Sequence, residues 1–139
     1  EGSFTPTYDA PNQAGAGFGH FHNYGRYTKI GNIVNVVIYI QGYCSSNAGG
    51  GANDDLKVVG LPFTPAAIVG GGDGRHTANW AIGSRYKLEC DDLTATTYAG
   101  NSHIDLLVPS NGGTGTMLKT NQADQNTTQF WATATYRTG

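Results

Sequence analysis

The sequence contains little charge and no long apolar run. Charged residues make up 13% of its 139 positions, about half of the roughly 25% that is usual in a globular domain. The 8 basic and 10 acidic residues are scattered along the chain, so we expect no nucleic-acid partner, which requires a basic patch. No segment approaches the ~20 apolar residues of a membrane-spanning helix, and the first residues lack the pattern of a signal peptide.

Cysteine is also scarce. Cys44 and Cys90 are the two cysteines, and they form neither a CxxC motif nor a Cys/His zinc spacing. A single disulfide between them and two reduced, buried thiols both remain compatible with the sequence.

Large aliphatic residues and phenylalanine are few for a chain of this length. Leu, Ile, Val and Phe together number 26, which is close to the level at which disorder becomes a concern. The net charge of −2 is too small for a disordered chain, and 8 Tyr and 2 Trp add apolar area. We therefore expect a folded domain with a small core, stabilised in part by neighbouring subunits.

Short alternating segments separated by glycine dominate the sequence, which has 21 glycines. Residues 32–41 are the clearest strand, with Val34, Val36, Ile38 and Ile40 on one apolar face and a mixed face around Val37 and Tyr39. Further strands are expected at 56–63, 84–90, 103–108 and 128–137, with weaker ones at 4–8 and 77–82.

Turn-rich stretches at 45–55, 70–74 and 110–116 separate these strands, and no segment shows a helical apolar period. We therefore predict an all-β fold, with residues 1–139 forming a single β-sandwich domain of jelly-roll or Greek-key type.

Four motifs occur in a fixed order along the chain. They are EGSFTPTY at 1–8, GRYTKIGN at 25–32, VGLPF at 59–63 and the closing Tyr136-Arg137. In this order and spacing they resemble the distal, C-terminal domain of bacteriophage tail fibres and tailspikes. The similarity covers both ends and the first half of the chain and is poor from 70 to 129.

The resemblance implies a homotrimeric domain at the end of a longer fibre chain, attached to an upstream shaft. It implies assembly in the host cytoplasm, location in the virion tail, and either binding of a bacterial surface polysaccharide or lipopolysaccharide or a role in trimer assembly. From their own chemistry, the Gly31-Asn32 turn signal and the 60–63 GLPF segment are interpreted as determinants of the fold.

A run of aromatic and imidazole side chains occupies residues 17–25. If this run is extended, His20 and His22 point to one face and Phe21 to the other. Around a threefold axis, three such pairs could offer six imidazoles to a transition metal. The alternative is an aromatic arm packed between subunits, or a solvated loop.

Aromatic residues beside amides and cations suit sugar recognition, because a sugar ring stacks on the aromatic face and its hydroxyls need polar partners. Trp131 with Gln129 is one weaker candidate, since it lies within an expected strand. The predicted ligand-binding residues are Trp80, Asn79, Arg75, His76, Tyr98 and Asn101.

Signals of catalysis are absent from the motifs. The acidic residues form no recognisable acid/base set, and neither a GxSxG motif nor a phosphate-binding loop occurs. We therefore expect no enzymatic activity and no cofactor, and we expect receptor binding, with an assembly module as the alternative.

Overall fold

The computed structural model describes residues 1–10, 17–44, 54–67, 78–88, 92–109, 115–124 and 126–139. Over these residues the chain is all-β, as predicted, with one short 3-10 helix, η1 (Thr120–Gln122), and no α-helix. The strands are β1 (Gly2–Phe4), β2 (Thr7–Asp9), β3 (Phe18–Ile30), β4 (Ile33–Cys44), β5 (Lys57–Val59), β6 (Ala78–Ser84), β7 (Thr94–Thr97), β8 (His103–Val108), β9 (Thr116–Met117) and β10 (Thr128–Arg137).

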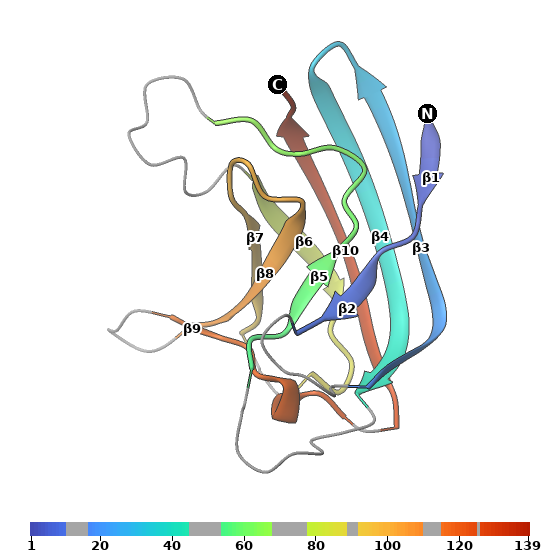
Figure 1. Ribbon diagram of the computed structural model, residues 1–139, viewed down its shortest axis with the longest axis vertical. Coiled ribbons are helices and arrows are strands. Elements are labelled where there is room, and N and C mark those ends of the chain that lie inside the picture. The colour runs from blue at the N-terminus through green and yellow to red at the C-terminus, as the bar shows by residue number, and fades with distance from the viewer. Residues whose placement is uncertain (11–16, 45–53, 68–77, 89–91, 110–114, 125) are drawn as a thin grey trace.

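The strands form one curled antiparallel sheet with the shape of half a barrel (Figure 1). Its order is β1-β3-β4-β10-β6-β7-β8-β5-β2, and β9 adds to β8. The sheet turns at β6, which pairs with β10 through 81–84 and with β7 through 78–80. The predicted jelly-roll sandwich, which has two separate sheets, is not confirmed, because β6 joins the two halves into one sheet.

The first nine residues connect the two edges of this sheet. β1 pairs with β3 at one edge and β2 pairs with β5 at the other, with Thr5 and Pro6 between them. The backbone N–H of Tyr8 donates to Nε2 of His20 on β3 at 3.0 Å, and the amide of Asn23 donates to the carbonyl of Pro6 at 3.1 Å. These contacts hold the two edges close to each other.

The core lies between the two halves of the sheet. Val34, Val36, Ile38 and Ile40 on β4 are all 0% exposed, which confirms the predicted inward face of this strand. Since side chains alternate along a strand, the residues between them face outward. Other strands contribute the buried residues Tyr8, Val58, Trp80, Ala95, Ile104, Leu106 and Phe130.

The strands expected at 103–108 and 128–137 are confirmed as β8 and β10. The strand expected at 84–90 is wrong over its described part: β6 ends at Ser84, and the N–H of Leu88 donates to the carbonyl of Arg85 at 3.2 Å. Lys87 has a φ of 54°, a left-handed conformation that belongs to a turn and not to a strand.

The Gly31-Asn32 turn signal and the GLPF segment at 60–63 have the structural roles expected of them. Gly31, with a φ of 59°, forms a two-residue hairpin turn with Asn32 between β3 and β4. In the GLPF segment, Leu61 is buried and the Phe63 ring meets Tyr27 edge-on at 5.1 Å. The Tyr136 hydroxyl donates to the carbonyl of Phe63 at 3.0 Å, which joins this motif to the last strand.

Aromatic rings lie over glycines on neighbouring strands. An added Cβ at Gly83 would lie 2.6 Å from the Trp131 ring, and one at Gly2 would lie 2.5 Å from the Tyr27 ring. The missing side chain leaves room for the ring, and the ring shields backbone that glycine would otherwise expose. Part of the high glycine content therefore belongs to the strands.

Over the described residues, no helix has the length and apolar character needed to cross a membrane.

Phe130→Ala tests the core assignment. Phe130 is fully buried, whereas its neighbour Trp131 is 47% exposed. We expect Phe130→Ala to lower the free energy of unfolding by about 3–5 kcal/mol, because it leaves a cavity in the core. Trp131→Ala, the control on the same strand, should cost about 1 kcal/mol or less. Equal losses in urea denaturation would contradict the inward and outward assignment of β10.

Candidate functional site: an exposed aromatic row

Three aromatic side chains lie side by side on the outer face of the sheet. Trp131 on β10 is opposite Tyr39 on β4, which is opposite Tyr24 on β3. Trp131 is 47% exposed and Tyr24 is 57% exposed, and the Tyr24 and Tyr39 ring centroids are 5.3 Å apart. We call Tyr24, Tyr39 and Trp131 the aromatic row.

The alternation of the three strands places this row in solvent. Ile38 and Ile40 on β4 are buried in the core, so Tyr39 between them must face outward. Phe130 likewise points inward and sends Trp131 outward, where the indole lies over Gly83. The same packing that builds the core therefore presents the aromatic rings to solvent.

Polar side chains flank the aromatic row. The pair beyond it towards the turn is Arg26 opposite Val37, and the pair on the other side is His22 opposite Gln41. The Tyr39 hydroxyl donates to Oε1 of Gln41 at 3.4 Å. Rings that offer an apolar face, next to guanidinium, amide and imidazole groups, suit a ligand with both C–H faces and hydroxyls.

A shallow depression of about 470 Å³ lies next to the aromatic row on the β1 side. Arg26 contributes to it from the register position two residues from Tyr24, which is roughly 7 Å along the strand. The depression is lined by Glu1, Gly2, Ser3, Arg26, Tyr27, Thr28, Asn35 and Val37.

Trp80 lies elsewhere than the sequence prediction placed it. It is on β6, is 5% exposed and belongs to the core, and its buried indole N–H has no hydrogen-bond partner among the described residues. A side chain enclosed in this way cannot stack on a ligand from solvent. The prediction is corrected: it relied on the preceding glycine-rich sequence, whereas the inward position of Trp80 in the alternation along β6 sets the orientation of this side chain.

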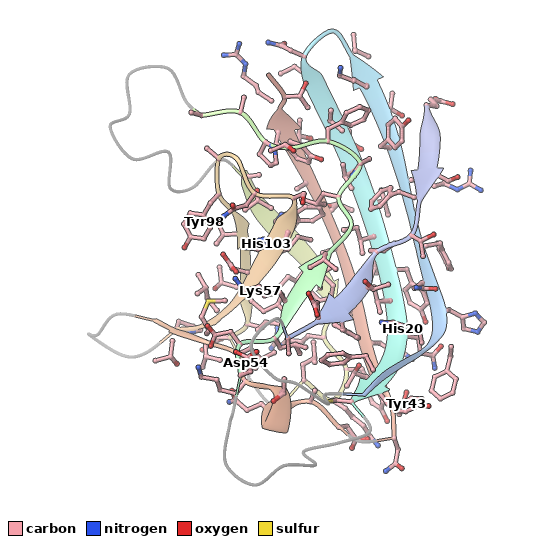
Figure 2. All side chains as sticks on the ribbon, viewed as in Figure 1. His20, Tyr43, Asp54, Lys57, Tyr98 and His103 are labelled. Atoms are coloured by element: carbon pink, nitrogen blue, oxygen red, sulfur yellow. The ribbon has the colours of Figure 1, made fainter. Side chains whose placement is uncertain are left out.

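The other predicted ligand-binding residues do not gather around Trp80 in the part that the structure describes. Arg75 and His76 lie outside the described residues, and of Asn79 only the backbone is described, paired with Thr96. Tyr98 is half-buried and Asn101 is exposed, in the turn that follows β7. Figure 2 shows Tyr98 on the half of the sheet that carries β7 and β8.

Asn101 and Tyr98 are tied by this turn. The backbone N–H of Asn101 donates to the carbonyl of Tyr98 at 3.2 Å, and Gly100 between them has a φ of 80°. The turn holds both residues together between β7 and β8, which are not strands of the aromatic row.

His20 and His22 do not share a face, contrary to the sequence prediction. A register shift between them leaves Phe21 without a paired residue on β4, so His20 is opposite Gly42 and His22 is opposite Gln41. This bulge sends the two imidazoles to opposite sides of the sheet. His20 stacks on the buried Tyr8 ring at 5.8 Å, while His22 is solvent-exposed.

A cluster of charged side chains lies on the other half of the sheet (Figure 2). Nζ of Lys57 and Nε2 of His103 lie 3.2 and 3.4 Å from Oδ1 of the buried Asp105. In the described part of the chain, this oxygen has no aligned hydrogen-bond donor. Burial lowers the pKa of His103; Asp105 opposes this shift and Lys57 adds to it. Among the described residues, no group of three or more His, Cys, Asp or Glu side chains could hold a metal ion.

Cys44 is buried at the end of β4, whereas Cys90 lies outside the described residues, so the question of their pairing stays open.

No protein-family model, no curated protein and no solved structure matches this chain.

The aromatic row was only partly predicted from the sequence. It named Trp131 and noted the mixed face around Tyr39, but it did not place Tyr24 on a strand. The alternation of side chains along a strand could have found the row: once Val34, Val36, Ile38, Ile40 and Phe130 are taken as inward, Tyr39 and Trp131 must be outward.

Trp80→Ala should act on stability. Removing a fully enclosed indole is expected to lower the free energy of unfolding by about 3–5 kcal/mol. Urea denaturation monitored by circular dichroism measures the loss. A variant as stable as the wild type would show that Trp80 is not part of the core.

His20→Gln should weaken the pH dependence of stability. Burial lowers the pKa of folded His20 from its usual 6.5, so the unfolded chain binds a proton more readily and acid favours unfolding. The stability from neutral His20 is complete above about pH 7 and is lost as the pH falls through and below the unfolded pKa.

The free energy of unfolding, measured by denaturation between about pH 7.5 and pH 5, should therefore fall less in His20→Gln than in the wild type. His103 maintains part of the dependence, since its pKa is also lowered. The exposed His22→Gln is the matched control and should behave as the wild type. An unchanged slope in His20→Gln would contradict the role of burial.

Proposed function

We propose that this chain is a non-catalytic receptor-binding domain of a phage tail fibre or spike, which attaches to a bacterial surface polysaccharide or lipopolysaccharide through the aromatic row. The observation that carries the proposal is the solvent exposure of Tyr24 and Trp131 on either side of Tyr39. The four sequence motifs that resemble tail-fibre domains supply the biological setting.

Exposed aromatic rings on a rigid sheet suit sugar binding for two reasons. The pyranose ring has an apolar C–H face that gains from contact with an aromatic ring, and strands hold the rings in place without a cost in loop ordering. The hydroxyls of the sugar would find Gln41, Asn35 and His22 on the same outer face.

A homotrimeric jelly-roll-like assembly is part of the proposal. A shallow site of this kind binds weakly, and several copies on one particle raise the avidity through effective concentration. Exposed aliphatic residues at the β3–β4 hairpin support contact between chains: Ile30 is 77% exposed and Ile33 is 41% exposed. A trimerisation module is therefore the second candidate function, carried by this end of the outer face.

Trp131→Ala and Tyr24→Ala should each lower the affinity for bacterial polysaccharides by about ten- to hundredfold, which corresponds to a loss of roughly 1–3 kcal/mol per stacked ring. The measurement is binding of the variants to an array of purified bacterial polysaccharides and lipopolysaccharides. Light scattering, which reports the trimer, and thermal unfolding confirm that the variants are assembled and folded.

Tyr98→Ala is the matched variant, since it removes an aromatic ring from the other half of the sheet. It should bind as the wild type. Loss of binding in Tyr98→Ala with full binding in Trp131→Ala would move the site to the turn after β7. Loss of the trimer in Trp131→Ala, with no glycan bound by the wild type, would favour the assembly function.

A further inference from the structure

The strands of the outer face carry charge of one sign. β1, β3, β4 and β10 contain no acidic residue. Arg26 and Arg137 lie on their outer face, whereas Lys29 is opposite the buried Val34 and lies on the inner side of β3. The whole chain has a net charge of −2, and its acidic residues lie outside these four strands. A face that is locally basic on an acidic protein attracts an anionic ligand selectively.

Of these three cations, Arg26 is placed for a ligand. The Nζ of Lys29 lies over the Phe63 ring at 4.9 Å from its centroid, and Arg137 is opposite Ile33 at the hairpin end of the face. Arg26 is exposed and lines the depression next to the aromatic row. Of the carboxylates that the structure describes, none forms an ion pair with its guanidinium.

The rest of the depression supplies neutral hydrogen-bonding groups. Ser3 is opposite Arg26 on the neighbouring strand, and Thr28 and Asn35 are opposite each other further towards the hairpin. The amide of Asn35 donates to the Thr135 hydroxyl at 3.0 Å, so its oxygen is left for a ligand hydroxyl. Glu1 lines the same depression and is the one carboxylate among the described residues that line it.

We infer that the site takes an acidic sugar, whose carboxylate pairs with Arg26 while its own or the adjoining ring stacks on Tyr24 and Tyr39. This inference rests on the proposed function and adds the substrate class. The fit is chemical: guanidinium binds carboxylate through two parallel hydrogen bonds, and the roughly 7 Å between the Arg26 and Tyr24 positions is within the span of one or two sugar rings. Glu1 would accept hydrogen bonds from the hydroxyls of the saccharide.

The test uses a panel of purified bacterial polysaccharides, each assayed in its native form and after chemical reduction of its carboxylates to hydroxymethyl groups. The wild-type chain should bind native polymers that contain uronic or other carboxylated sugars. Reduction of the carboxylates should lower the affinity about ten- to hundredfold, as expected for loss of a charge-assisted pair.

Arg26→Gln should reproduce this loss on the native polymer and should bind the native and reduced polymers equally. Arg26→Lys should retain part of the preference, because it keeps the charge and loses the paired hydrogen bonds. Arg137→Gln is the matched control, since it removes a cation from the same face outside the depression, and it should keep the full preference for the native polymer.

The outcomes separate the inference from the proposed function. Binding that Trp131→Ala abolishes, but that neither Arg26→Gln nor carboxylate reduction changes, overturns the acidic sugar and leaves glycan recognition in place. An Arg26→Gln loss that is equal on native and reduced polymers overturns the carboxylate pairing. If no polymer of the panel binds, both proposals are overturned. They are also overturned if a single-stranded oligothymidylate, whose bases can also stack on aromatic rings, binds more tightly than any polymer of the panel.

Discussion

The structure depends on the burial of one face of β4. Four aliphatic side chains, from Val34 to Ile40, have no exposed surface and pack against the other half of the curled sheet. Because a shift of one residue would send all of them into solvent, this face fixes the register of β4 with β3 and β10. The positions between them, including Tyr39, are consequently fixed on the outside, and so is the aromatic row.

The sequence predicted the strands in which this alternation is strong. β4 and β10 have β-branched and aromatic residues at a period of two, and β8 has Ile104, Leu106 and Val108 at the same period. The bounds of all three strands were predicted to within a few residues. β3 was not predicted as a strand, since its glycines lower the local strand preference. Its stability comes from 12 residue pairs with β4 and from rings that cover glycines on neighbouring strands, and such tertiary effects cannot be read from local sequence.

The candidate site was harder to predict, because alternation does not say which face is inward. Trp80 and Trp131 both lie in alternating segments, and the three-dimensional closure of the sheet decides that the first is buried and the second exposed. The bulge at Phe21, which separates His20 from His22, also depends on pairing with β4. The local sequence of residues 17–25 does not predict the position of this bulge. Arg26 could have been found only once β3 was known to pair with β4.

The path of the first nine residues has a mechanical consequence. β1 and β2 are short strands on opposite edges of the sheet, joined by Thr5 and Pro6. A pulling force applied at Glu1 would load three residue pairs between β1 and β3 first, and then the pairs between β2 and β5. Loss of these two pairings would uncover Tyr8 and the inner side of β4, so the resistance of the domain to tension is set by two strands of three residues and not by its longest strands.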